Sequence, residues 1–238
     1  MQPKPPDIAV VIPALNERAN LELLLPSLSA VTDGLGLLAE IIVVDGGSTD
    51  GSRTVAEQLG ARVIAQQERG YGGALLAGFA AARAPFVVTM DADLSHQPVF
   101  LEDFWQLRSD AELLIASRYV AGGSAEMGAV RRALSLVLNQ TYRRVLALPL
   151  RDVSSGFRMY HRDVLATLDL QARDFDVLEE ILVKVYLRGG RIREVPFHYQ
   201  ARESGKSHAK LIRFGWAFSK TLLRTWRLRN SAEARSGR

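Results

Sequence analysis

The sequence contains no cysteine among its 238 residues, so disulfide-stapled folds and thiolate metal sites are both excluded. It has no apolar run of about 18 residues, the length that a membrane-spanning helix needs. The first residues, MQPKPPDIAVVIP, do not have the layout of a signal peptide. Internal repeats and low-complexity stretches are also missing. These absences favour an ordinary globular protein, and we expect a cytoplasmic location because a reducing compartment suits a cysteine-free chain.

Positive charge is concentrated at the C-terminal end of the chain. The net charge is +4, but residues 202–238 hold ten Lys or Arg against two Glu, a local charge of +8. Residues 1–201 therefore carry −4. A basic tail of this kind is typical of chains that bind nucleic acid or an anionic membrane surface.

Segments of strand length alternate with segments of helical periodicity. Strands are predicted at 8–13, 40–45, 61–66, 85–91, 111–119 and 191–200. Helices are predicted at 16–31, 51–60, 69–84, 128–148 and 175–190, with a strand followed by a helix inside 154–168. The short strand–helix–strand connections of the first half predict a parallel sheet with right-handed crossovers. The fold class is therefore α/β, a Rossmann-like, mostly parallel sheet flanked by helices.

Two carboxylates, Asp91 and Asp93, follow the strand in VVTMDADLSHQP at 87–98. Ligands of open parallel sheets lie beyond the carboxyl ends of the strands, where Asp45 also falls. Two neighbouring carboxylates repel each other, and a hard cation such as Mg²⁺ or Mn²⁺ relieves the repulsion. The spacing alone leaves an alternative open, in which Asp91 caps a helix and Asp93 is solvated.

Several motifs together resemble a known family. VIPALNE, IIVVDGGSTDGS, VVTMDADLSHQP, ASRY and SSGFRMY occur in order, and they are similar to family 2 glycosyltransferases of the GT-A fold. MDADLSHQP and SSGFRMY resemble dolichol-phosphate or polyprenol-phosphate sugar synthases in particular. The resemblance implies an inverting, metal-dependent transfer of mannose or glucose from a nucleotide sugar, such as GDP-mannose or UDP-glucose, to dolichyl or undecaprenyl phosphate.

The family motifs carry over onto particular positions near the strand ends. Those matched to the nucleotide and donor sites are Pro13, Leu15, Glu17, Val44, Asp45, Asp91, Ala92 and Asp93. Asp91 and Asp93 are implied to hold Mg²⁺ or Mn²⁺. The chain departs from the family at Leu15, where tyrosine is common, and at Gly46, which stands in place of a second acid.

Basic residues further along match positions that grip the donor diphosphate or the acceptor phosphate. Arg118 is implied to be catalytic, and Arg131 and Arg158 to bind phosphate. Arginine suits this role because its planar fork bonds phosphate in two places. The alternatives are a surface residue closing a strand for Arg118, an exposed helix face for Arg131 and a structural salt bridge for Arg158.

The segment RESGKSH at 202–208 resembles a family loop that folds over the donor, with Arg202, Lys206 and His208 as binding candidates. His208 stands where the family has lysine, which replaces a permanent charge by one that titrates near neutrality. An ordinary basic loop is the alternative. Glu180 matches a family glutamate, expected to organise the acceptor pocket or to be partly structural. An acceptor phosphate is already an anion and needs little help from a base.

Two further features have structural alternatives. The glycines in GYGGALLAG at 70–78 either lie by the donor or allow close packing of a helix on the sheet. His96 and His161 are expected to be surface residues or neighbours of ligand-binding residues.

Residues 210–229, KLIRFGWAFSKTLLRTWRLR, form a basic amphipathic pattern. On a helical wheel one side holds Leu211, Gly215, Phe218, Leu222 and Trp226, and the other holds Arg213, Lys220, Arg224 and Arg227. The pattern predicts a catalytic domain at 1–209 and a helix and tail at 210–238 that lie on the cytoplasmic face of an anionic membrane. A helix packed on the catalytic domain is the alternative. Nucleic acid is not expected as a partner because no recognised nucleic-acid module accompanies the charge.

Two other functions stay open on the sequence. A transferase of the same family could act on a glycan or a small-molecule hydroxyl, and it would then need a general base. A non-catalytic peripheral membrane module with a degenerate nucleotide pocket is the other, and the intact Asp-Ala-Asp argues against it.

Overall fold

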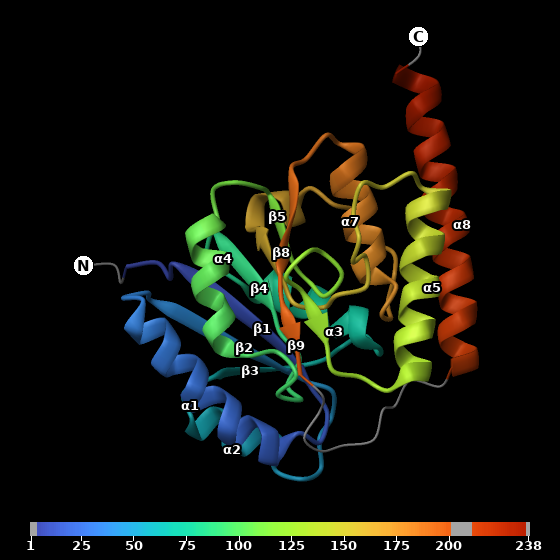
Figure 1. Ribbon diagram of the computed structural model, residues 1–238. Helices are drawn as coiled ribbons and strands as arrows, with labels where there is room; N and C mark the ends of the chain where they lie inside the picture. The colour runs from blue at the N-terminus through green and yellow to red at the C-terminus, as the bar shows by residue number, and fades with distance from the viewer. Residues whose placement is uncertain (1–3, 201–210, 237–238) are drawn as a thin grey trace.

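The computed structural model describes residues 4–200 and 211–236, with only the backbone described at 131, 211–217 and 232–236. Its strands are β1 Ile8–Ala14, β2 Ala39–Asp45, β3 Arg62–Ala65, β4 Phe86–Thr89, β5 Leu113–Ser117, β6 Ser124–Ala125, β7 Arg158–His161, β8 Ile192–Pro196 and β9 His198–Tyr199. Seven of these form one sheet in the order β3-β2-β1-β4-β7-β5-β8, and β6 pairs with β9 (Figure 1).

The helices are α1 Arg18–Gly34, α2 Ser52–Gln58, α3 Tyr71–Ala81, α4 Leu101–Leu107, α5 Ala129–Val145, α6 Arg162–Ala166, α7 Val177–Leu187 and α8 Leu211–Ser236, with a short 3₁₀ turn, η1, at Pro98–Phe100. The predicted α/β class with a mostly parallel sheet is confirmed, and the predicted elements match to within a few residues at most boundaries. The predictions lacked α4 and the short strand β6, and they merged β8 with β9.

Each face of the sheet is covered by helices because its strands are apolar on both sides. Ile8, Val10 and Ile12 of β1 point into a core layer with α1 and α4. Ala9 and Val11 point the opposite way, into a second layer with α3, α5 and α7. Alternate residues of a strand face opposite sides, so one short apolar strand serves both layers.

Strand β7 runs antiparallel to both of its neighbours, β4 and β5, which the strand–helix pattern did not predict. Its register pairs Arg158 with Thr89 and His161 with Phe86. Between β5 and β7 the chain passes through β6 and α5, and Arg158, the first residue of β7, lies opposite Thr89, the last residue of β4. Strand β7 therefore enters the sheet from the carboxyl edge. This arrangement brings the SSG segment before it next to the end of β4.

Helix α8 packs on the rest of the chain beside α5 and α7 (Figure 1). Phe218 makes an edge contact with the ring of Tyr142 on α5, with centroids 5.0 Å apart. Thr221 and Thr225 are buried, and Leu222 packs against the core. The side predicted to be the membrane-facing apolar side is thus, at Phe218 and Leu222, the side that packs on the domain.

The basic side of α8 also differs from the helical-wheel prediction. Arg224 is half-buried and forms an ion pair with Glu180, whereas Lys220 and Arg227 are exposed. Trp226 is not buried with Phe218 but is 41% exposed. The contacts of 218–225 match the alternative of a helix packed on the catalytic domain, and the domain boundary at 209 stays a prediction.

Candidate active site at the carboxyl edge of the sheet

The acid pair lies directly beyond β4, in the turn between that strand and η1. The side chain of Asp91 is 29% exposed. Asp93 is 5% exposed, and its Oδ1 accepts hydrogen bonds from the backbone N–H of Ser95 at 3.1 Å and from its hydroxyl at 2.5 Å. Leu94, between Asp93 and Ser95, has a φ of 62°, a left-handed conformation that tightens the turn. The turn thus places both carboxylates at the predicted edge of the sheet.

Asp91 is held by two aromatic side chains. The hydroxyl of Tyr71 donates to Oδ1 of Asp91 at 3.0 Å. The backbone N–H of Asp91 donates to Nδ1 of His96 at 3.0 Å, so a neutral His96 carries its proton on Nε2. Burial, and then the charge of Asp91, raise the pKa of Tyr71 well above its ordinary value, so the phenol stays a donor. His96 is therefore a buried neighbour of the acid pair rather than a surface residue.

The loops after β1 and β2 lock into each other beside the acid pair. Asn16, with a φ of 57°, donates its N–H to the hydroxyl of Ser48 at 2.9 Å and accepts at its side-chain oxygen from the N–H of Thr49. The N–H of Glu17 donates to the hydroxyl of Ser52 at 2.9 Å. These bonds explain why Asn16 and Glu17 occur together with the segment GGSTDGS at 46–52, because each loop supplies hydrogen-bond partners that the other needs.

Of the residues matched to nucleotide contacts, some face solvent and some do not. Leu15 is 48% exposed, and Pro13 and Glu17 are half-buried. Asp45 is 8% exposed and accepts from the N–H of Ser48 at 3.0 Å. Val44 is fully buried in the core, so it supports the strand end and offers no side chain to a ligand. Ala92, matched to the donor motif, is 4% exposed.

Gly46 stands where the family has a second acid, and a neighbour fills the space. A Cβ on Gly46 would lie 3.1 Å from Oε1 of Gln66. The amide nitrogen of Gln66 donates to the carbonyls of Glu68 and Gly70, both at 2.6 Å. The Gln66 amide thus occupies the position next to Asp45, a feature that the sequence motifs did not reveal.

The arginine predicted to be catalytic, Arg118, is bound to the protein itself. Its guanidinium donates to both oxygens of Asp152 at 2.7 Å and to the hydroxyl of Ser154 at 2.9 Å. Burial opposes its charge, but Asp152 outweighs that effect and the pKa of Arg118 is raised. In this geometry Arg118 anchors the segment before β7, and its implied catalytic role stays a prediction.

Arg158 is likewise a structural residue in the described geometry. It is fully buried, and three of its nitrogens donate to the backbone carbonyls of Val153, Ser155 and Leu178 at 2.6–2.7 Å. Its donors are all directed at carbonyl groups of the protein backbone. The salt-bridge alternative was also inaccurate, because the partners are carbonyls rather than a carboxylate.

Glu180 lies at the centre of a buried network on α7. It is fully buried, forms ion pairs with Lys184 at 2.8 Å and Arg224 at 3.1 Å, and accepts from the N–H groups of Gln171 and Ala172. These contacts match the expectation that Glu180 is partly structural, and its role in organising an acceptor pocket stays a prediction. Glu180 ties α8 and the 171–172 segment to α7.

The remaining candidate residues lie wholly or partly outside the part of the chain that the structure describes. Arg131 falls in the first turn of α5, and its side chain is outside the described part. Arg202, Lys206 and His208 all fall in 201–210, outside the described residues. The loop that resembles the family's donor loop therefore remains a sequence prediction.

The described donors fit a divalent cation that is shared with a diphosphate. Asp91 and Asp93 supply hard oxygen ligands, and the described residues hold no group of three or more His, Asp or Glu that could bind a metal alone. Mg²⁺ is often held by one or two carboxylates, with waters and substrate phosphates completing the shell. Two carboxylates at a half-open edge suit that arrangement.

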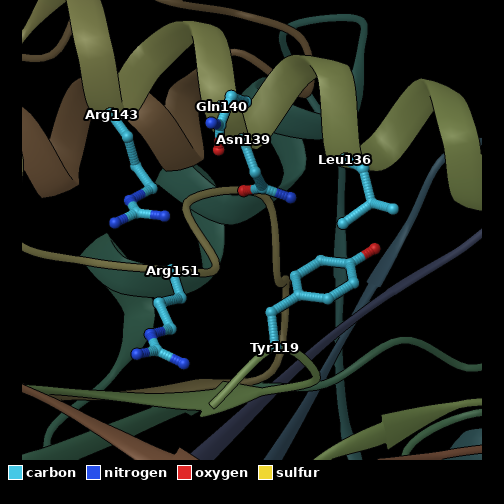
Figure 2. A pocket seen from close by; sticks show the side chains of 6 residues that line it. All are labelled: Tyr119, Leu136, Asn139, Gln140, Arg143 and Arg151. Atoms are coloured by element: carbon cyan, nitrogen blue, oxygen red, sulfur yellow. The ribbon is translucent and has the colours of Figure 1, made fainter.

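A hollow of about 270 Å³ lies between α5 and the segments that follow β5 and precede β7. Figure 2 shows Leu136, Asn139, Gln140 and Arg143 of α5 facing Tyr119 and Arg151 across it. The acid pair does not line this hollow. Arg143 and Arg151 were not among the predicted site residues, and the helical periodicity of α5 gave no signal that distinguished Arg143 from a solvated basic face.

The sheet order, the acid pair and the interlocked loops define an α/β protein with an acidic edge suited to a cation and a nucleotide. The profile of glycosyl transferase family 2 matches residues 9–169. The chain belongs to this family.

Three curated relatives match over most of the chain. A dolichyl-phosphate hexose transferase of Haloferax volcanii is 29% identical over 92% of this chain and 93% of its own length. A polyprenol monophosphomannose synthase of Mycolicibacterium smegmatis is 34% identical over 83% and 79%. A dolichol-phosphate mannosyltransferase of Pyrococcus furiosus is 32% identical over 85% of this chain, which spans 59% of that relative.

Solved structures of glucosyl-3-phosphoglycerate synthase from Mycobacterium tuberculosis share the fold. The complex with Mn²⁺, UDP and glucosyl-3-phosphoglycerate has a TM-score of 0.72 and 26% identity, over 92% of this chain and 80% of that one. The complex with Mg²⁺ and UDP has a TM-score of 0.73 and 27% identity, over 92% and 79%. The predicted GT-A fold is confirmed by this likeness.

Proposed function

We propose that this protein transfers a hexose, mannose or glucose, from a nucleoside-diphosphate sugar to a polyprenyl phosphate with inversion at the sugar carbon. The observation that carries the proposal is the acid pair Asp91 and Asp93, set by a tight turn at the carboxyl edge of a family 2 chain. Three relatives, each a hexose or mannose transferase or synthase for dolichyl or polyprenyl phosphate, support the choice of acceptor.

Asp91 and Asp93 would hold Mg²⁺ or Mn²⁺, which neutralises the leaving nucleoside diphosphate when bound. Pro13, near the end of β1, and Leu15 and Glu17, in the loop after it, would lie around the nucleoside, and this loop is bonded to the loop after β2. The hydrogen bonds between the two loops fix these residues before the donor arrives, which lowers the ordering cost of binding.

The acceptor is proposed to attack without a general base. Glu180, the carboxylate that would serve a hydroxyl acceptor, is buried against Lys184 and Arg224 and holds two backbone N–H groups. A phosphate oxygen is already anionic near neutrality and needs no such base. The placement of Glu180 therefore favours a phosphate acceptor over a hydroxyl acceptor.

The test is a transfer assay with radiolabelled UDP-glucose and GDP-mannose against undecaprenyl phosphate, dolichyl phosphate and 3-phosphoglycerate. We expect label in the lipid phase and a loss of at least about 100-fold in Asp93→Ala, with Asp33→Ala on the exposed end of α1 as the matched control. Near-normal transfer by Asp93→Ala at added metal would refute the mechanism. Label in 3-phosphoglycerate alone would favour the hydroxyl-acceptor transferase.

We also propose peripheral attachment at the cytoplasmic face of an anionic membrane. Among the described residues, none of the helices combines the length and the apolarity that crossing a bilayer requires. Large apolar side chains are nevertheless exposed on α8, namely Leu223, Trp226 and Leu228, next to the cations Lys220 and Arg227. Exposed leucine and tryptophan beside basic residues suit a headgroup layer.

A further inference from the structure

We propose that Tyr71 is a positioning residue that fixes the Asp91 carboxylate for a divalent cation, and that Phe175 holds Tyr71 in place. The inference rests on the proposed function, because that function makes Asp91 a metal ligand. Tyr71 and Phe175 belong to α3 and to the segment before α7, far apart in the sequence, and neither was singled out as a site residue by the motifs.

Hydrogen bonds from the described residues hold one carboxylate oxygen of Asp91 and do not reach the other. Oδ1 of Asp91 accepts from the hydroxyl of Tyr71 at 3.0 Å, while Oδ2 lies 3.9 Å from Nε2 of His96. The Asp91 backbone N–H is bound by Nδ1 of the same imidazole. The backbone N–H of Asp91 and one of its carboxylate oxygens are thus held. Among the described residues, Tyr71 is the only one that donates a hydrogen bond to the Asp91 side chain.

Tyr71 is itself held on two sides. Its ring stacks on that of Phe175, with centroids 4.6 Å apart and planes 14° from parallel. At the hydroxyl end of the ring lies Gly156, where an added Cβ would sit 2.9 Å from the Tyr71 hydroxyl and 3.7–3.8 Å from the Asp91 oxygens. Glycine in the SSG motif therefore makes room for the tyrosine–aspartate bond.

The glycine cluster before and within α3 has a matching explanation. A Cβ on Gly70 would lie 2.2 Å from the carbonyl oxygen of Arg173, and one on Gly72 would lie 2.7 Å from the same carbonyl carbon. The N–H of Gly73 donates to that carbonyl oxygen at 3.2 Å. The backbone that precedes Phe175 thus packs directly on the turn that carries Tyr71, which only glycines allow.

A buried network fixes the segment that carries Phe175. Glu180 accepts from the N–H of Gln171 at 3.0 Å and from that of Ala172 at 2.7 Å. Arg173 forms an ion pair with Glu68, just before α3. The segment just before Phe175 is therefore fixed at residues 171–173, which helps to keep the ring of Phe175 on that of Tyr71.

The test measures metal binding rather than activity alone. Mn²⁺ is titrated into the full chain, first alone and then with UDP, and free Mn²⁺ is followed by electron paramagnetic resonance. Hydrogen-bond partners behind metal ligands usually change affinity by about 10- to 100-fold, so we expect Tyr71→Phe to weaken Mn²⁺ binding by at least about tenfold. The Mn²⁺ concentration for half-maximal transfer should rise by the same factor, and saturating Mn²⁺ should restore most of kcat.

Tyr142→Phe is the matched control, because the Tyr142 hydroxyl is buried and finds no hydrogen-bond partner in the described part of the chain. It should bind Mn²⁺ like the wild type. Phe175→Leu keeps an apolar contact but removes the stack, and it should weaken Mn²⁺ binding by a smaller factor than Tyr71→Phe.

The outcomes separate two failures. If the wild type binds no Mn²⁺ under either condition, the metal role of Asp91 is refuted, and the positioning role with it. If the wild type binds Mn²⁺ and Tyr71→Phe binds it equally well, only the positioning role is refuted. A merely structural tyrosine would lower the thermal midpoint and kcat without changing Mn²⁺ affinity, and that result would also overturn the inference.

Discussion

Glu179 on α7 gives the fold a pH dependence that one substitution should remove. The side chain is 5% exposed, and its Oε2 has no hydrogen-bond partner in the described part of the structure. Burial raises the pKa of Glu179 to about 8 from an ordinary 4.5, and nearby Arg158 only partly opposes this. The folded protein therefore keeps a proton on Glu179 at pH values where the unfolded chain has lost it.

The sign and size of the effect follow from linkage. Because the folded pKa is the higher one, the stabilisation is fully present below the unfolded value near 4.5 and is lost as pH rises through about 8. Each pH unit between these limits lowers the free energy of unfolding by about 1.4 kcal/mol. Between pH 5 and pH 8 the wild type should lose about 3–4 kcal/mol through this one group.

Glu179→Gln replaces the protonated acid by a neutral side chain of the same shape. Urea unfolding at pH 5, 6, 7 and 8 should show the variant close to the wild type at pH 5 and more stable by about 3 kcal/mol at pH 8. Glu57→Gln, which removes only an exposed ion pair with Arg53, should change stability by less than about 0.5 kcal/mol throughout. Parallel stability profiles for Glu179→Gln and the wild type would refute a protonated Glu179.

Two further predictions concern backbone packing and the surface of α8. Gly72→Ala should destabilise the fold by about 3 kcal/mol or more in urea unfolding, because its Cβ would overlap the Arg173 carbonyl. Gly34→Ala, with open space around the new Cβ, should be neutral or slightly stabilising. Equal effects of the two substitutions would contradict the close approach of Gly72 to Arg173. Replacing Leu223 and Trp226 together by serine should weaken flotation with phosphatidylglycerol vesicles about tenfold, and unchanged flotation would show that α8 is not the contact surface.

Much of the architecture could be predicted from local patterns. Strands β1 and β2 are short and apolar, with Pro13 next to the last residue of β1 and Asp45 as the last residue of β2, and their alternation with helices specifies a parallel sheet. The reversal of β7 could not be predicted this way, because its direction depends on where the chain lies after β5. Helix α4 was missed because it is short and its first turn follows directly from a 3₁₀ turn.

The candidate site was predictable where function depends on backbone position and less so where it depends on side-chain direction. Asp91 and Asp93 fall where the strand ends, so the motif located them. Arg118 and Arg158 are in motifs too, but a sequence does not say whether a guanidinium points at solvent or at Asp152 and backbone carbonyls. No sequence motif pointed to Tyr71, because its hydrogen-bond partner, Asp91, is twenty residues away and on another element.

The ion pair between Arg224 and Glu180 has a consequence for how the C-terminal region can be studied. Cutting the chain before α8 would strip a guanidinium from a fully buried carboxylate and would also uncover Tyr142. The catalytic domain of a truncated protein would therefore be destabilised, and a loss of hexose transfer by that protein would say little about lipid contact. Point changes on the outward side of the helix are the cleaner way to separate attachment from chemistry.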